Sequence, residues 1–226
     1  MDCESALSLR RTDLPDPLSG ATSHSADPLL RSWTPRRFGW LLALFFLFAG
    51  CTSGAPTEDS EPGGRHLLPG PVAEGIEYSE PTPGLPTAPD LDLTLLDGTE
   101  LELSELWTQR PTVVVFFSSW CGSCADQQQR LSELVAAHGD AVAFLGVAGR
   151  DEPAEVRDFL VEHAVGYPVA LDTDQRAARH YAAEEPPLIA VIERGGGLVR
   201  GVPGGITDAE AATELDEQLR DLYRRK

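Results

Sequence analysis

Basic residues are scarce in this chain. Its 226 residues include 18 Lys and Arg against 36 Asp and Glu, which gives a formal net charge of −18. No extended cluster of Lys and Arg occurs beyond the N-terminal region. Binding to nucleic acid depends on such clusters, because they neutralise the phosphates. The composition therefore argues against nucleic acid as a partner.

Cysteine is also scarce, since the chain has four and only Cys121 and Cys124 form a Cys-x-x-Cys pair. Zinc sites take four ligands, and here a second such pair is missing while the histidines are scattered along the sequence. Copper delivery would normally use three residues between the cysteines, whereas only two separate Cys121 from Cys124. We therefore expect no metal and no other cofactor.

A short apolar run lies near the N-terminus, at residues 38–49, behind Arg31, Arg36 and Arg37. About a dozen residues are too few to span a bilayer comfortably but suit an export signal. The small residues before Cys51 resemble the lipobox of bacterial lipoproteins, which implies a lipid on Cys51. We expect residues 1–50 to be an N-terminal extension and signal, with the rest outside the cytoplasm; an uncleaved membrane anchor is the alternative.

The composition changes after this signal. Residues 52–90 contain eight prolines and six glycines and few large apolar side chains. Such a segment buries too little surface to offset the entropy lost on ordering. We therefore expect residues 51–90 to form a disordered tether and residues 91–226 to form the folded domain.

Apolar patterning within the domain predicts strands that alternate with helices. Asp97 and Gly98 lie between two alternating segments, which is a strong hairpin signal. The expected strands are 91–95, 101–103, 112–117, 142–148, 169–171, 188–192 and 198–202, and the expected helices begin at 104 and span 121–138, 153–164, 175–181 and 208–223. This order predicts an α/β sandwich with a mixed central sheet.

The pair Cys121 and Cys124 follows directly on the apolar strand 112–117 and opens the next helix. A sulfur at a helix N-terminus meets unpaired N–H groups and the positive end of the helix dipole, and both favour the thiolate. The thiolate is the form that attacks disulfides. The segment therefore predicts thiol-disulfide exchange.

The whole domain resembles the thioredoxin superfamily, and within it the TlpA-like membrane-anchored thiol-disulfide oxidoreductases. The resemblance rests on motifs in the right order and spacing: Asp97, Gly98, the run 103–106, Phe116, Phe117, Trp120, Cys121 and Cys124. It implies a thioredoxin-like fold, a mixed sheet flanked by helices, with an N-terminal β-hairpin and an inserted strand-helix unit around residues 147–172.

The resemblance also implies roles for the site residues. Cys121 would attack and Cys124 would resolve the mixed disulfide. Pro187 would be the cis-proline beside the two cysteines, and Trp120 and Pro186 would complete the substrate-binding surface. Because proline has no N–H, Pro186 would offer a bound peptide one hydrogen bond fewer than relatives do.

Two further positions depart from the pattern of that family. Val115 stands where a buried acid is often found, and Gln127 stands where TlpA-like reductases often have Glu. A neutral amide cannot take a proton from Cys124 as a carboxylate could. The proton acceptor is therefore open, with the neighbouring Asp126, water or the partner as candidates.

The function expected from these observations is that of an extracytoplasmic, membrane-anchored lipoprotein that exchanges disulfides, with reduction of envelope proteins as the expected direction. Its partners would be proteins with cysteine pairs, a membrane or periplasmic electron donor, and the membrane itself through the lipid. The alternative is a non-catalytic thioredoxin-fold lipoprotein that acts as a binding or redox-sensing module.

Overall fold

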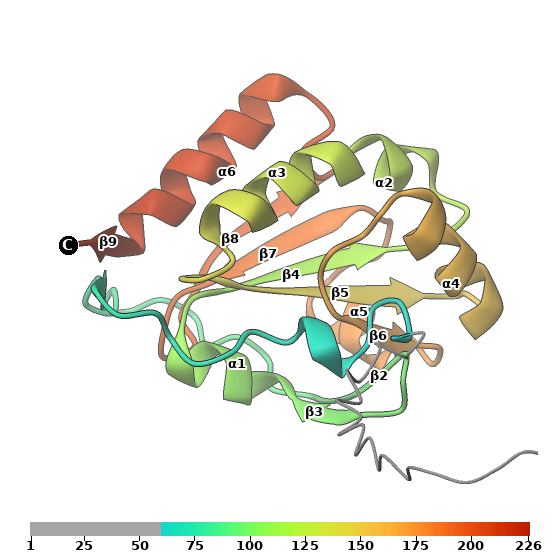
Figure 1. Ribbon diagram of the computed structural model, residues 1–226, viewed down its shortest axis with the longest axis horizontal. Helices are drawn as coiled ribbons and strands as arrows, with labels where there is room; N and C mark the ends of the chain where they lie inside the picture. Colours follow the sequence, from blue (N-terminus) through green and yellow to red (C-terminus); the bar gives the residue numbers. More distant parts are fainter. Residues whose placement is uncertain (1–59) are drawn as a thin grey trace, which may run out of the picture. The chain divides into compact units, whose positions relative to one another are not determined.

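A seven-stranded mixed sheet forms the centre of the protein in the computed structural model, which describes residues 60–226 (Figure 1). The strand order is β3-β2-β6-β5-β4-β7-β8. These strands are β2 (Asp92–Leu95), β3 (Glu100–Glu102), β4 (Thr112–Phe117), β5 (Ala143–Gly149), β6 (Val169–Asp172), β7 (Leu188–Ile192) and β8 (Leu198–Pro203). Strands β4, β5 and β6 are parallel, and the remaining neighbours pair antiparallel. The predicted mixed sheet and its N-terminal hairpin β2–β3 are confirmed.

Helices cover both faces of this sheet. They are α1 (Leu103–Gln109), α2 (Gly122–Asp126), α3 (Gln128–His138), α4 (Pro153–Glu162), α5 (Arg176–His180) and α6 (Ala209–Asp221). Helices α2, α3, α4 and α6 share one apolar core with Val113, Val115 and Phe117 of β4, whereas α1 and α5 share the other with Val114 and Phe116. Successive side chains of a strand point to opposite faces, so β4 is apolar throughout because both of its faces are buried.

The helix expected over residues 121–138 is interrupted. Helix α2 ends at Asp126, Gln127 joins the two segments, and α3 begins at Gln128. The side chain of Gln127 is fully buried, and its Oε1 accepts a hydrogen bond from the backbone N–H of Ile206 at 3.0 Å. The interruption therefore coincides with a side chain that turns inward, which helical periodicity alone does not predict.

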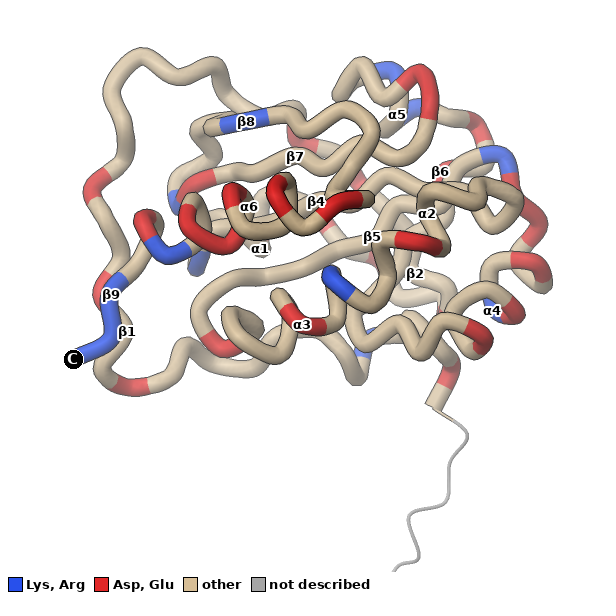
Figure 2. Tube along the Cα trace, turned by 90° about the horizontal axis from the view of Figure 1, so that it is seen from above, with Lys and Arg blue, Asp and Glu red and all other residues tan. Residues whose placement is uncertain are grey.

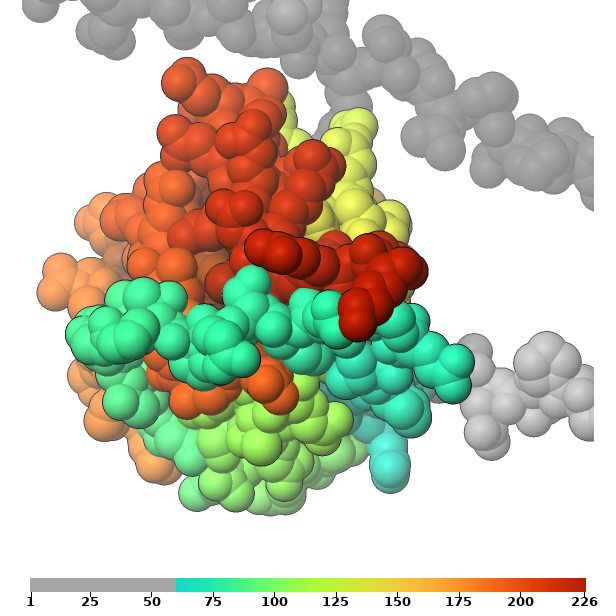
Figure 3. Space-filling model, turned by 90° about the vertical axis from the view of Figure 1, so that its left-hand side faces the viewer, coloured from blue at the N-terminus to red at the C-terminus, as the bar shows by residue number. Residues whose placement is uncertain are grey.

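The prediction of a disordered tether is wrong for residues 60–90, while residues 51–59 lie outside the described part. This segment contains a short 3-10 helix, η1 (Arg65–Leu67), and strand β1 (Ile76–Tyr78). Strand β1 pairs antiparallel with an unexpected C-terminal strand, β9 (Tyr223–Arg225). Figure 3 shows the segment 60–90, in blue-green, lying along the C-terminal end of the chain, in dark red. The folded domain therefore begins well before residue 91.

Neighbouring elements supply the contacts that the composition of this segment lacks. The carbonyl of Gly63 accepts a hydrogen bond from Val169 N–H, and a Cβ at Gly63 would lie only 2.8 Å from Leu160. The Tyr78 hydroxyl donates to the Ala141 carbonyl at 3.1 Å. The buried Arg110 guanidinium donates to the carbonyl of Gly70. Tertiary contacts thus offset the ordering entropy that the segment cannot offset alone.

Within residues 60–226, no helix is both long enough and apolar enough to cross a membrane. The apolar run at 38–49 and the predicted lipidation site Cys51 lie outside the described residues, so the expected signal and anchor stay predictions.

Candidate functional site

Cys121 and Cys124 are joined by a disulfide at the start of α2, with their Cα atoms 5.2 Å apart. Strand β4 and its loop deliver Cys121 to the N-cap position of the helix. There Cys121 Sγ accepts a hydrogen bond from Cys124 N–H at 3.1 Å. In the reduced protein this donor would stabilise a thiolate on Cys121, because a hydrogen bond to the charged form favours that form.

Both cysteines are largely shielded from solvent. Cys124 is fully buried, and Cys121 is 7% exposed. Gly122 and Ser123 are exposed between them, and Ser123 Oγ lies 3.4 Å from Cys121 Sγ. The exposed surface beside Cys121 is therefore formed in part by this dipeptide.

The peptide bond between Pro186 and Pro187 is cis, as the resemblance implied. Cys121 Sγ lies 3.7 Å from the Pro186 carbonyl oxygen, so this loop faces the dithiol. Pro186 also lines a shallow hollow with Trp120, which is 61% exposed. The structure thus brings together Cys121, Cys124, Trp120, Pro186 and Pro187, all the predicted site residues within the described chain except for the lipidation site.

Gln127 lies behind the cis-proline loop and is buried. A Cβ on Gly205 would meet Gln127 Oε1 at 2.1 Å and the Pro187 ring at 3.0 Å, so these three residues are in close contact. Gln127 Nε2 is buried and has no hydrogen-bond partner within residues 60–226. Val115 is buried in the core that contains both cysteines. The two departures therefore place a buried amide beside the loop behind the cis-proline and an aliphatic side chain in the shared core, while Asp126 is exposed on α2.

A buried hydrogen-bond chain that the sequence did not predict supports Cys124 from behind. Gln128 Nε2 donates to the Cys124 carbonyl at 2.9 Å, and the Tyr167 hydroxyl donates to Gln128 Oε1 at 2.9 Å. Burial raises the pKa of the Tyr167 hydroxyl well above its ordinary value, so it remains a donor. Tyr167 is distant in sequence, and no periodic pattern links it to the cysteines.

A second missed residue is Asp151, in the loop between β5 and α4. Its Oδ1 accepts hydrogen bonds from the N–H of Ser119 at 2.9 Å and from the Ser119 hydroxyl at 2.5 Å. A single Asp in a loop carries no sequence signal of its own. In the structure it fixes the segment just before the dithiol.

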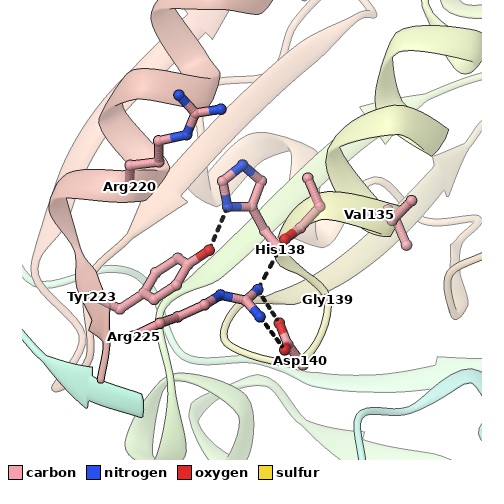
Figure 4. A pocket seen from close by; sticks show the side chains of 9 residues that line it. Val135, His138, Gly139, Asp140, Arg220, Tyr223 and Arg225 are labelled. Atoms are coloured by element: carbon pink, nitrogen blue, oxygen red, sulfur yellow. Dashed lines mark hydrogen bonds and ion pairs between the residues drawn. The ribbon is translucent and has the colours of Figure 1, made fainter. Parts of the chain in front are cut away.

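A larger hollow, of about 680 Å³, lies between α3 and β9 (Figure 4). The ring of His138 on α3 contacts Tyr223 Oη and Asp216 Oδ1, both at 2.8 Å. Arg225 forms a two-point ion pair with Asp140. These side chains are paired with one another and join α3 to the C-terminal elements, and none of the predicted site residues lines this hollow. We therefore place the site at the dithiol.

Within the described residues, no three His, Cys, Asp or Glu side chains come together in a way that could hold a metal ion. The chemistry that the arrangement offers is that of the two sulfurs. A helix-capping sulfur, a shielded second sulfur and a facing cis-proline loop together suit exchange between this dithiol and a disulfide.

Known proteins share this fold. A secreted disulfide oxidoreductase of Mycobacterium tuberculosis, described as homologous to DsbE of E. coli, is 24% identical with a TM-score of 0.52, over 58% of this chain and 96% of that one. A putative thiol:disulfide interchange protein DsbE of Chlorobium tepidum is 22% identical with a TM-score of 0.55, over 60% of this chain and 94% of that one. These similarities confirm the predicted thioredoxin-like fold.

Sequence comparison adds the family. Thiol-disulfide oxidoreductase ResA of Bacillus thuringiensis (strain Al Hakam) is 24% identical over 118 residues, which are 52% of this chain and 68% of that protein. The profile of the AhpC/TSA family matches residues 86–201, just over half of the chain and including the dithiol. The chain therefore belongs to the AhpC/TSA family, as a thiol-disulfide oxidoreductase with a thioredoxin-like fold.

Proposed function

We propose that this protein is an extracytoplasmic oxidoreductase that reduces disulfides of envelope proteins through Cys121 and Cys124. The observation that carries the proposal is the disulfide at the N-terminus of α2, which faces the cis-proline loop at Pro186 and Pro187. The names of the matched relatives, oxidoreductases and interchange proteins, support the same chemistry.

The reaction proceeds in two exchanges. The Cys121 thiolate attacks one sulfur of the target disulfide, a bond forms between these sulfurs, and the other target sulfur leaves as a thiolate. Cys124 then attacks Cys121, which forms the Cys121–Cys124 disulfide and releases the second target sulfur. The target gains two electrons and this protein loses two. A membrane or periplasmic electron donor must then reduce the disulfide again.

The proposed location rests on the sequence near Cys51. The arginines and the apolar run before it support export, and the small residues ahead of it support lipidation as in TlpA-like anchored proteins. A lipid on Cys51 would leave the chain attached to the outer side of the membrane. Proteins with cysteine pairs in the same compartment would then be its substrates.

The test of substrate and location uses a Cys124→Ser variant in the native host, because this change stops the second exchange. We expect covalent complexes with cysteine-containing envelope proteins, which disappear on reduction and are absent when Cys121→Ser is added. Recovery of no complex, or of the same complexes without Cys121, would overturn the proposal. Incorporation of labelled palmitate that is lost in Cys51→Ser tests the anchor separately.

A further inference from the structure

Asp151 is a buried carboxylate for which the proposed exchange provides no role. Its side chain is 6% exposed, and its Oδ1 accepts both hydrogen bonds from Ser119. Its Oδ2 is buried and has no hydrogen-bond partner among the residues that the structure describes. In the same part of the chain, no Lys, Arg or His forms an ion pair with it. A buried oxygen without a partner is costly and therefore calls for an explanation.

The contact reaches the segment that carries the dithiol. Ser118 and Ser119 connect β4 to Cys121, and the N–H of Cys121 donates to the Ser118 carbonyl at 3.1 Å. The Ser118 hydroxyl donates to the Gly149 carbonyl at 2.5 Å, next to the Asp151 contact. Ser119 lies only two residues before Cys121, so the Asp151 carboxylate lies on the order of 10 Å from the attacking sulfur.

We propose that Asp151 is a positioning residue that holds Ser119 and makes the Cys121 thiol less acidic through its negative charge. The inference rests on the proposed function, since it concerns the protonation of the attacking sulfur. A carboxylate disfavours a second negative charge nearby, and burial strengthens this effect. It acts against the stabilisation that the Cys124 N–H provides.

Several other charged groups in this part of the structure are exposed, and water and salt screen them: Asp126 on α2, Arg150 and Glu152 beside Asp151, and Glu184 and Glu185 ahead of Pro186. Asp172 lines the same hollow as Trp120 and Pro186 and is buried, but both of its carboxylate oxygens accept backbone N–H hydrogen bonds at α5. Asp151 is the buried carboxylate that contacts the segment just before the dithiol. Because a less stable thiolate favours the disulfide over the dithiol, the Asp151 charge lowers the reduction potential and favours the reducing direction.

The test measures how the alkylation rate of Cys121 depends on pH in the reduced full-length protein. Asp151→Asn removes the charge but keeps an oxygen that Ser119 can donate to. With about 10 Å between this charge and the Cys121 sulfur and an effective dielectric constant of about 20, we expect the midpoint of the alkylation rate against pH to fall by about one pH unit in Asp151→Asn. At a pH above both midpoints, the matching tenfold change in the exchange equilibrium with glutathione raises the potential by about 30 mV.

The matched control is Ser119→Ala, which removes one of the two hydrogen bonds and keeps the charge. We expect it not to lower the midpoint. An unchanged midpoint in Asp151→Asn, or an equal fall in Ser119→Ala, would overturn the inference. If Asp151 only held Ser119 in place, removing its charge would change the stability of the protein but would not change the acidity of the Cys121 thiol through that charge.

A second variant covers the case in which Asp151→Asn does not fold. Ser119→Ala combined with Asp151→Ala removes the hydroxyl together with its acceptor, so that only the Ser119 N–H loses a partner, and it should lower the midpoint in the same way. A midpoint equal to that of the wild type would contradict the inference. Alkylation and potential are measured without a protein substrate, so they remain informative even if the protein fails to reduce one.

Discussion

At the scale of single residues, the contact between Gln127 and Gly205 ties the helix of the dithiol to the loop behind the cis-proline. The Gln127 amide oxygen bonds Ile206 N–H, and Gly205 leaves no room for a side chain beside it. Gly205 also has a φ of +67°, a region that favours glycine. Neighbouring Gly204 shares this conformation, with a φ of +77°, but a Cβ there would meet nothing within 4 Å.

These two glycines form a matched pair. We expect Gly204→Ala to lower the free energy of unfolding by about 1–2 kcal/mol, the cost of the left-handed conformation alone. Gly205→Ala should cost about 1–3 kcal/mol more, because the methyl group displaces the Gln127 amide and leaves Ile206 N–H without a partner. Urea unfolding at neutral pH measures both, and equal losses would show that the contact has no energetic role.

The buried Tyr167 gives a pH dependence whose sign is fixed. Burial raises the pKa of its hydroxyl above the value near 10 of the unfolded chain. Its contribution to stability is therefore present below about pH 10 and is lost as the pH rises toward the folded value. When the pH rises from 8 to 11, the free energy of unfolding of Tyr167→Phe should fall by about 1 kcal/mol less than that of the wild type. Urea unfolding of the oxidised protein at both pH values measures this difference. An identical loss in both proteins would contradict this assignment.

At the scale of elements, the segment from residue 60 to residue 90 is part of the domain because other elements hold it. Arg110 joins this segment to the loop between α3 and β5, because its guanidinium donates hydrogen bonds to the carbonyls of Gly70 and Asp140. On the surface, Arg194 instead lies over the ring of Tyr78, with 5.4 Å between its Cζ and the ring centroid. The buried arginine therefore carries the stronger attachment.

Replacing each arginine by methionine tests this difference. We expect Arg110→Met to lower the free energy of unfolding by about 2–4 kcal/mol, because two hydrogen bonds from a buried cation are lost. Hydrogen exchange at residues 60–80 should become faster. The surface variant Arg194→Met should cost about 0.5–1 kcal/mol. A similar small effect of both would mean that the segment is held mainly by the β1–β9 pairing.

Element prediction from the sequence succeeded where local pattern decides the structure. The strands 112–117 and 188–192 have the bounds that were predicted, because each is an apolar run that follows a proline and ends before a polar residue. Asp97 and Gly98 marked the hairpin correctly, with Gly98 at a φ of +83°. Strands β1 and β9 were missed, since each is three residues long and is ordered mainly by its distant partner.

At the scale of the whole molecule, helix α2, which begins at the dithiol, lies away from the C-terminal strand β9 (Figure 1). Acidic residues recur along α4 and α6, while basic residues gather on β9 (Figure 2). The strong negative charge of the chain therefore is not uniform over the described residues.

The candidate site was predictable in part for the same reason as the fold. Cys121 and Cys124 follow from a short motif and the cis bond at Pro187 follows from the family resemblance, and the structure brings them together. Asp151 and Tyr167 were not predictable, because they reach the site through the packing of β5, β6 and α4 rather than through any local pattern. Long-range packing thus supplies the surroundings of the dithiol, and the motif supplies the sulfurs.

The central claim is that Cys121 and Cys124 catalyse disulfide exchange, and reduction of insulin by dithiothreitol tests it most directly. The purified wild type should accelerate insulin precipitation, and Cys121→Ser should reduce the rate to that of dithiothreitol alone, because no attacking thiolate remains. A Cys121→Ser protein that is as active as the wild type would contradict the account.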